Sequence, residues 1–225
     1  MKTKRMLYLI LAVLCGICLI FSGCVGGNNP ETPSGTLSGK TPESSHESQP
    51  PKTPDSETGG TENGGILVVY FSRSGNTEGM AKSIAALTGG TLFEIEPSIL
   101  YSTNYQETVD RHKKELADNA RPEIAHTVEN WESYQTVFIG FPLWSGNAPM
   151  IIHSFMESYD FTGKTVIPFS TSGGSSGSPA YRNLADAYPG VTFGDGLNLT
   201  GSQITSPDTS VTPWLIDLGL LKEGA

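Results

Sequence analysis

The sequence predicts a doubly wound α/β fold, in which helices cover both faces of a parallel β-sheet. Three observations lead to this prediction. Short apolar runs recur along residues 66–225, they alternate with segments of helical periodicity, and polar loops containing glycine follow several of them. Near-continuous apolar runs are typical of strands that are buried on both faces of a parallel sheet. Right-handed crossovers between such strands give a three-layer sandwich.

Five segments are expected to form the strands. Three of them are apolar almost throughout, which favours positions in the middle of the sheet: residues 66–71, 136–141 and 165–169. Residues 91–95 and 191–199 have fewer apolar side chains and are expected nearer the edges.

Segments of helical periodicity separate these runs. Their larger side chains recur at intervals of three and four positions, as one buried stripe along a helix requires. Five stripes have this spacing: Met80, Ile84 and Leu87; Tyr105, Val109, His112 and Leu116; Ile152, Phe155, Met156 and Tyr159; Tyr181, Leu184, Ala185 and Tyr188; Val211, Trp214, Leu215 and Leu218. The last two helices are expected to begin at Ser178–Pro179 and at Ser206–Pro207, with Asp208 as an alternative cap. The element order is therefore βαβαβαβαβα.

The first 23 residues have the organisation of a secretory signal peptide. Three cations among the first five residues precede an apolar run over residues 7–21, and small residues follow it. Residues 20–24, IFSGC, resemble a bacterial lipobox, where cleavage precedes a cysteine whose sulfur carries diacylglycerol. The resemblance implies that residues 1–23 are removed and that Cys24 is the lipidation site of an extracytoplasmic, membrane-anchored lipoprotein. The other two cysteines lie within the signal, so no disulfide or cysteine metal site is expected in the mature chain.

Residues 24–65 are expected to form a disordered tether. After Cys24, only Val25 and Leu37 have apolar side chains, against six prolines and many Ser, Thr, Gly and Glu. Such a segment cannot bury enough apolar surface to offset the entropy lost on ordering. Residues 66–225 remain, which is enough for one domain with a sizeable core.

The mature chain is expected to be strongly acidic. The whole sequence has a net charge of −9, and loss of the three signal cations leaves 11 Lys and Arg against 23 Asp and Glu. Binding to nucleic acid and charge-driven adsorption to an anionic bilayer both need basic surface, so neither is expected. Contact with a membrane is expected through the lipid anchor alone.

Three polar loops that contain glycine follow the strongest strands: residues 72–77, 142–147 and 170–177. In doubly wound sheets, ligands bind beyond the carboxyl ends of the central strands, so the three loops are expected to meet at one crevice.

The first loop, SRSGNT, has the chemistry of a phosphate site. Backbone N–H groups at the start of a helix and three nearby hydroxyl groups would donate hydrogen bonds to a phosphate, and Gly75 would let the backbone approach it. The alternative is a serine-rich turn in which Asn76 or Thr77 caps the following helix.

The three loops resemble, in order and after the corresponding strands, the phosphate loop and the two flavin loops of flavodoxins: SRSGNT, FPLWSGNAP and PFSTSGGSSG. In addition, YSTNYQETVDRHKKE resembles a helix inserted in flavodoxin-like bacterial lipoproteins. The resemblance extends from about residue 66 to the C-terminus and implies a flavodoxin-like five-stranded sheet of order 2-1-3-4-5, with FMN as cofactor. The resemblance implies that the FMN phosphate is held by Ser72, Arg73, Ser74, Gly75, Asn76 and Thr77. It implies that one side of the isoalloxazine ring is bordered by Pro142, Leu143, Trp144, Ser145 and Gly146, and that its other edge is lined by Thr171, Ser172, Gly173, Gly174 and Ser175.

Two departures from the family pattern concern the flavin ring. Relatives commonly have a second tryptophan where this chain has Ser145, and the third loop, residues 170–179, contains no aromatic residue that would cover one flavin face. Trp144, flanked by Pro142 and by Ser145–Gly146 at a strand end, is expected to line a pocket, whereas Trp131 and Trp214 are expected in the core.

Two further patterns in the sequence are open to other interpretations. Residues 173–177, GGSSG, match the nucleophile elbow of serine hydrolases, but no histidine follows Ser175, so the order Ser, acid, His cannot be met. His112, His126 and His153 are separate from one another and from acidic pairs, which favours structural histidines over a metal site.

The sequence therefore predicts a redox protein in which the flavin performs the chemistry and no side chain is assigned a catalytic role. The favoured hypothesis is an FMN-dependent reductase of a small acceptor such as a quinone. Two alternatives stay open: a one-electron carrier for a protein partner, and a binding module that kept the fold without the cofactor.

Overall fold

The computed structural model describes residues 65–223. The predicted signal peptide, the proposed lipidation site at Cys24 and nearly all of the predicted tether lie outside the described residues. Within the described range, the first strand begins at Gly65, one residue before the predicted start of the domain.

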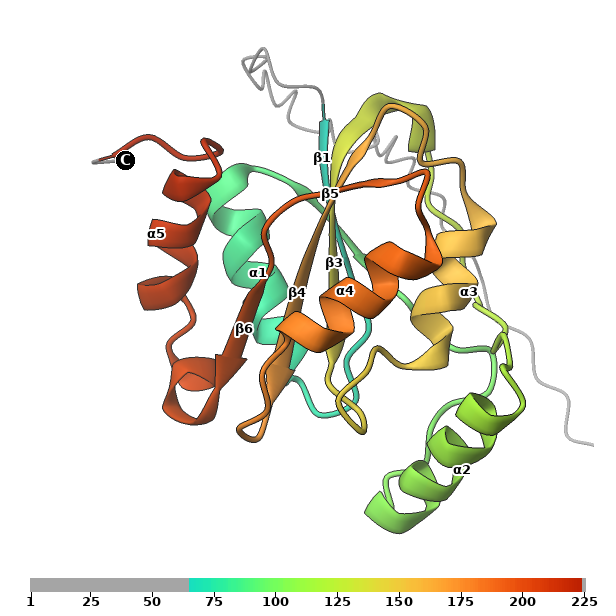
Figure 1. The fold of residues 1–225 in the computed structure, drawn as a ribbon. Helices are drawn as coiled ribbons and strands as arrows, with labels where there is room; N and C mark the ends of the chain where they lie inside the picture. Colours follow the sequence, from blue (N-terminus) through green and yellow to red (C-terminus); the bar gives the residue numbers. More distant parts are fainter. Residues whose placement is uncertain (1–64, 224–225) are drawn as a thin grey trace, which may run out of the picture. The chain divides into compact units, whose positions relative to one another are not determined.

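One parallel sheet forms the centre of the domain (Figure 1). Residues 65–223 contain six strands: β1 Gly65–Tyr70, β2 Thr91–Glu94, β3 Tyr134–Pro142, β4 Thr165–Ser172, β5 Thr192–Phe193 and β6 Leu197–Thr200. The order is β2-β1-β3-β4-β5, and β6 also pairs with β4. The predicted order 2-1-3-4-5 is confirmed.

The segment predicted as a single strand over residues 191–199 is interrupted. β5 pairs with β4 as far as Val166, and β6 resumes pairing at Phe169. Between them lies Pro168, which has no N–H to donate, and a Cβ on Gly196 would come within 2.7 Å of the Pro168 carbonyl oxygen. The chain must therefore bend around Pro168, and the predicted fifth strand becomes two short ones.

Five α-helices connect the strands within residues 65–223: α1 Asn76–Thr88, α2 Tyr105–Ala117, α3 Met150–Ser158, α4 Ser178–Ala187 and α5 Asp208–Asp217. Two short 3-10 helices, η1 Trp131–Ser133 and η2 Gly201–Thr205, complete the elements. Pro179 lies in the first turn of α4, and Pro207 directly precedes α5, so both predicted helix starts are close to the observed ones.

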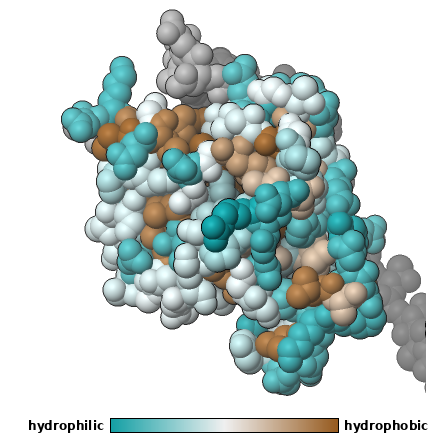
Figure 2. Space-filling model, in the orientation of Figure 1, coloured by the Kyte–Doolittle hydropathy of each residue, from teal (hydrophilic) through white to brown (hydrophobic). Residues whose placement is uncertain are grey.

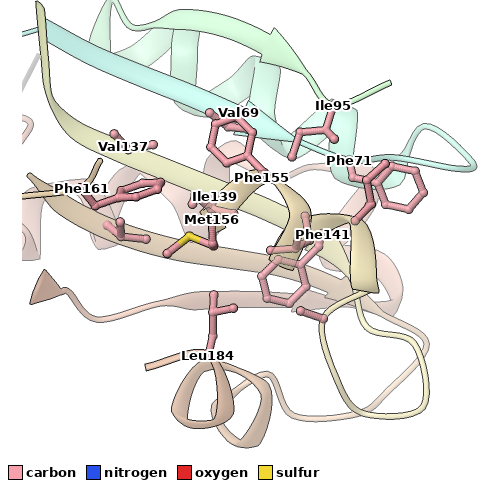
Figure 3. Close-up of a cluster of buried hydrophobic side chains, with 14 of the residues drawn as sticks. Val69, Phe71, Ile95, Val137, Ile139, Phe141, Phe155, Met156, Phe161 and Leu184 are labelled. Atoms are coloured by element: carbon pink, nitrogen blue, oxygen red, sulfur yellow. The ribbon is translucent and has the colours of Figure 1, made fainter. Parts of the chain in front are cut away.

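The side chains of β1 alternate between the two faces of the sheet. Val68 and Tyr70 pack with α1 and α5, whereas Leu67, Val69 and Phe71 belong to the cluster on the face covered by α3 and α4. Figure 3 shows this second cluster, in which side chains of α3 and α4 pack against β1 and β3. Burial on both faces explains why the central strands are apolar almost throughout.

The second helix departs from its predicted stripe. Tyr105 and Leu116 are 74% and 44% exposed, and the buried residues of α2 are Thr108, His112 and Glu115. The helix lies at the end of the sheet where β1 and β3 terminate, instead of covering a face (Figure 1). Its buried side therefore meets loop residues such as Trp144. Of the predicted stripe, His112 is buried and Val109 half-buried, whereas the expectation that Tyr105 and Leu116 are buried was wrong.

The surface of the described domain is mainly hydrophilic, with small separate apolar areas (Figure 2). Ile99 and Leu100, in the segment before α2, are the most exposed aliphatic side chains at 76% each. None of the helices between residues 65 and 223 combines the length and the apolar character needed to cross a bilayer.

Candidate functional site

The three predicted loops meet at the carboxyl ends of β1, β3 and β4. Thr171, at the end of β4, makes contacts with both of the other loops. Its hydroxyl shares a buried 2.9 Å hydrogen bond with the hydroxyl of Thr77, and its carbonyl accepts a 2.9 Å hydrogen bond from the Leu143 N–H. One buried residue thus holds the three loops around a common crevice.

The first loop presents unpaired backbone donors. Gly75 precedes α1 in the left-handed conformation, with φ of 83°, and no side chain in the described part of the chain caps this helix. The first N–H groups of a helix have no partner within the helix, so those of α1 remain available. The Ser72 hydroxyl accepts a 3.2 Å hydrogen bond from the Gly75 N–H, which fixes the turn.

The space in front of this loop fits a phosphate. Ser74, Gly75 and Asn76 are exposed, and a Cβ built on Gly75 would meet only the Glu78 carboxylate, 4.0 Å away. Glu78 is paired with Lys82 one turn later, which reduces its repulsion of an anion. The alternative of a side-chain cap from Asn76 or Thr77 does not describe this turn, because Thr77 is buried and bonded to the third loop.

Arg73 points away from the phosphate loop. Its Nε donates to the Ser102 carbonyl at 3.2 Å and to the Thr108 hydroxyl at 3.1 Å, and its Nη2 donates to the Thr103 carbonyl at 2.7 Å. The side chain implied at the phosphate by the family resemblance therefore holds the segment before α2 against the first loop.

The second loop is a tight two-residue turn. Trp144 and Asn147 exchange backbone hydrogen bonds of 3.0 Å in both directions, with Ser145 and Gly146 between them at φ of 52° and 77°. Positive φ at both central residues is typical of a type I′ turn. The Ser145 side chain is exposed.

Trp144 lines a pocket, but its ring belongs mainly to an aromatic cluster. It lies edge-on to Phe71, Tyr101 and His112, with ring centroids 5.4, 5.0 and 5.3 Å apart. These three contacts direct the half-buried indole towards α2 and the segment before it. Trp131 and Trp214 are buried, at 8% exposure each, as expected for core residues.

The third loop is held by hydroxyl and amide side chains. The Ser172 hydroxyl donates to the Ser175 carbonyl at 2.7 Å, and the Asn198 amide donates to the same carbonyl at 2.9 Å. Gly173 and Gly174 are exposed, and a Cβ on either would meet no atom of the described residues within 4 Å apart from its chain neighbours. Open space therefore lies over this loop.

The nearest tyrosine of α4 does not cover the third loop. The Tyr181 hydroxyl shares a 2.6 Å hydrogen bond with the Ser170 hydroxyl and donates to the Leu197 carbonyl at 2.8 Å. Burial raises the pKa of this phenol. Tyr181 thus connects β4 and β6 beneath the loop.

The histidines differ in their surroundings. His126 is exposed beside Glu96, and His153 is half-buried with its Nδ1 2.9 Å from the Tyr188 hydroxyl, which fits a structural role for both. His112 is only 3% exposed, and neither ring nitrogen has a hydrogen-bond partner among residues 65–223. Across the same residues, no group of three His, Cys, Asp or Glu side chains is placed to hold a metal ion.

Sequence reasoning missed the pocket to which His112 belongs. The cavity has a volume of about 230 Å³ and is lined by Arg73, Tyr105, Thr108, Val109, His112, Leu143, Trp144 and Ser145. Burial lowers the pKa of His112, partly offset by the charge of Glu115 and by the interaction of the imidazole with the Trp144 main chain. The available signal was a histidine on the buried side of a helix whose other inward residues are also polar.

Comparisons with known proteins agree with the fold and the loops. The flavodoxin family profile matches residues 65–217. Among solved structures, a candidate flavoprotein from Bacteroides uniformis is 39% identical, with a TM-score of 0.63, and the match covers 69% of this chain and 99% of that protein. A candidate flavoprotein from Bacteroides eggerthii is 35% identical, with a TM-score of 0.63 and coverage of 70% and 99%.

A flavoprotein from Lactobacillus acidophilus, solved in complex with FMN, is 25% identical, with a TM-score of 0.53 and coverage of 64% and 97%. A search of curated proteins found no match. The family match covers more than half of the chain and includes all three loops. With its strand order and its crevice, this chain belongs to the flavodoxin family, as the sequence predicted.

Proposed function

We propose that this protein is an FMN-dependent reductase of a small planar acceptor, held outside the cytoplasm by a lipid anchor. FMN is the cofactor of this flavodoxin-family domain, in agreement with the FMN complex of the Lactobacillus relative. When bound, the flavin supplies one- and two-electron redox chemistry. The chain itself binds the cofactor, orients it and determines which molecules reach it.

The phosphate would be held by the first loop. The hydroxyls of Ser72 and Ser74 and the free N–H groups at the start of α1 surround the open space in front of Gly75. Thr77 contributes indirectly, since its hydrogen bond to Thr171 fixes the loop relative to β4. The remaining residues of the second and third loops would lie along the ring.

The observation that supports a reductase is the open third loop. Residues 173–176 are exposed and contain only Gly and Ser, and Ser145 presents a small exposed side chain from the second loop. A planar acceptor can stack on a flavin face only where no protein ring covers it, and hydride transfer needs such close contact. The loops therefore favour direct two-electron transfer to a small molecule.

One observation favours the alternative of a one-electron carrier. The mature chain has an excess of 12 acidic residues, and complementary charge speeds the encounter of a protein with a cationic partner. A redox partner protein with a basic docking surface is the corresponding expectation.

The experiment that separates these functions starts from the absorbance spectrum of the purified protein. A flavin spectrum would exclude the cofactor-free module. Anaerobic photoreduction followed by 1,4-naphthoquinone should restore the oxidised spectrum, with one quinone consumed per FMN. Failure of the quinone to reoxidise the protein would overturn the reductase proposal and leave the carrier.

The anchor is tested separately. Cys24→Ala should prevent labelling by a radioactive fatty acid and prevent processing at the signal, because diacylglycerol is attached to the cysteine sulfur. Labelling that persists in this variant would refute the lipoprotein assignment.

A further inference from the structure

Arg73 attaches the phosphate loop to the segment that precedes α2. Its Nε and Nη2 donate three hydrogen bonds of 2.7 to 3.2 Å, to the carbonyls of Ser102 and Thr103 and to the hydroxyl of Thr108. Within residues 65–223, no other hydrogen bond joins residues 72–75 to an element other than α1. Between the strand and the helix at its two ends, the phosphate loop is therefore held by one side chain.

The segment over residues 99–103 has no regular backbone pairing. Within the described domain, none of its main-chain groups bonds to another main-chain group. Instead, Arg73 binds the carbonyls of residues 102 and 103, and Arg111 Nη1 binds those of residues 99 and 100 at 2.8 and 3.0 Å. Segments with few backbone hydrogen bonds open readily, so the position of this one depends on the two arginines.

The first turn of α2 is attached to the same segment. The Asn104 side chain caps the helix and accepts hydrogen bonds of 2.8 and 3.2 Å from two of its first N–H groups. The Thr108 hydroxyl accepts from Arg73 Nε at 3.1 Å and donates to the Ser102 carbonyl at 2.8 Å. Arg73 therefore connects the phosphate loop directly to α2 as well as to the segment before it.

The free loop has little internal support for its conformation. Ser74, Gly75 and Asn76 are exposed, and the bond from the Gly75 N–H to the Ser72 hydroxyl closes only a local turn. A phosphate held by main-chain N–H groups needs those groups to converge on one point. A loop that is fixed before binding loses less conformational entropy on binding, so a support from outside the loop raises its affinity.

Two roles for Arg73 are compatible with its place in the phosphate loop: a direct contact with the phosphate, or support of the loop. Direct contact would require the guanidinium to leave its three acceptors. The Thr103 carbonyl would then have no hydrogen-bond partner among residues 65–223. The observed contacts favour the supporting role.

From these contacts we propose that Arg73 is a positioning residue for FMN. It holds the phosphate loop in its binding conformation by anchoring it to residues 102–108, without touching the phosphate, and thereby couples the start of α2 to phosphate binding. The proposal rests on the part of the proposed function in which the first loop holds the FMN phosphate, and it does not depend on the identity of the acceptor.

The first test compares the affinities for FMN and for riboflavin, which has the same ring system and no phosphate. In the mature protein freed of flavin, Arg73→Met should weaken FMN binding at least about tenfold, the effect of losing one hydrogen bond to a charged group. Riboflavin binding should be nearly unchanged, which also shows that the variant is folded. An unchanged ratio of the two affinities in Arg73→Met would overturn the proposal.

Arg111→Met is the matched control. It removes the same charge and releases the same segment, but the hydrogen bonds of Arg111 in the described domain go to Glu115 and to the carbonyls of residues 99 and 100. This variant should keep the wild-type ratio of FMN to riboflavin affinity. A loss equal to that of Arg73→Met would refute a specific role of Arg73.

Thr108→Val separates support of the loop from the effect of charge. The variant keeps Arg73 and its charge, but it removes the hydroxyl of a buried residue that accepts from Arg73 Nε. Support of the loop predicts weaker FMN binding with unchanged riboflavin binding. An arginine that turns to the phosphate would instead be released by this change, so equal or tighter FMN binding in Thr108→Val would contradict the proposal.

Hydrogen exchange followed by mass spectrometry tests the coupling to α2. Because linkage is reciprocal, a phosphate that binds better when the anchor is formed must also stabilise the anchor. FMN should therefore slow exchange in residues 102–110 more than riboflavin does, and this difference should vanish in Arg73→Met. Equal or faster exchange with FMN in the wild type would overturn the coupling.

The role of Arg73 and the proposed function can fail separately. A wild type that binds FMN no more tightly than riboflavin would refute the phosphate site itself. A wild type that prefers FMN, with an Arg73→Met variant that keeps this preference, would refute the role of Arg73 alone. Reoxidation of the wild type by a quinone is a separate measurement and is unaffected by either result.

Discussion

Gly75→Val is the sharpest test of the phosphate loop. Gly75 precedes α1 with φ of 83°, and Gly89 follows the same helix with φ of 69°. Apart from chain neighbours, no atom of residues 65–223 lies closer than 4.0 Å to a Cβ at Gly75, and none lies within 4 Å of one at Gly89. The two positions therefore impose similar backbone strain on valine, but only Gly75 faces the crevice.

The effect on folding should be similar in both variants. A left-handed conformation costs an L-residue about 1–2 kcal/mol, offset in part by the reduced entropy of the unfolded chain. For a domain of this size, 1 kcal/mol corresponds to a change of about 2–4 °C in Tm. We therefore expect each flavin-free variant to unfold a few degrees below the wild type.

The effect on FMN should differ. The branched side chain at residue 75 would occupy the space in front of the free N–H groups of α1, and a hydrogen bond to a charged group contributes about 1.5–3 kcal/mol. Losing one such bond weakens FMN binding about 10- to 150-fold. Titration monitored by the quenching of flavin fluorescence measures this change. Unaltered FMN affinity in Gly75→Val, or an equal loss in Gly89→Val, would show that this loop does not hold the phosphate.

Three further predictions concern stability. His112→Phe should raise the free energy of unfolding by about 1 kcal/mol, because it removes a buried polar group without a hydrogen bond. A lower free energy of unfolding in urea denaturation would mean that the imidazole has a partner. Gly140→Ala should destabilise the domain by about 1–3 kcal/mol, since its Cβ would lie 2.1 Å from the Phe169 ring, and an unchanged Tm would contradict this packing. Burial lowers the pKa of both His112 and His153, and at His153 the charge of Arg121 lowers it further. Below the pKa of about 6.5 that histidines have in the unfolded chain, the unfolded chain therefore binds more protons than the folded protein. The free energy of unfolding should then fall as the pH drops below about 6.5, and less steeply in His112→Phe; identical slopes in both proteins would count against a neutral buried His112.

Sequence periodicity predicted the layers and the strand order, because burial on both faces leaves a strong pattern in β1, β3 and β4. It could not predict the interruption of the fifth strand, which depends on Pro168 in the neighbouring strand and on the close approach of Gly196. Spacing also placed Tyr105 and Leu116 on a buried stripe, although α2 packs against loops at the end of the sheet. Which surface a helix meets is a tertiary property that its own periodicity does not specify.

The order of the three loops was predictable because each follows a recognisable strand. The directions of single side chains were not. Arg73 turns towards the segment before α2, and Trp144 towards an aromatic cluster that includes Tyr101 and His112. These contacts join residues about 30 or more positions apart, and neither loop reveals them by itself.

In the turn formed by Ser145 and Gly146, the side chain at residue 145 can change without affecting the folding of the domain. Its backbone is fixed by the paired hydrogen bonds between Trp144 and Asn147, and the side chain at residue 145 is exposed. Replacements that tolerate positive φ, such as asparagine or aspartate, should therefore leave the scaffold intact. Evolution or a protein engineer can vary charge and size beside the crevice at this one residue, so the domain can acquire a new acceptor preference without first acquiring a new loop.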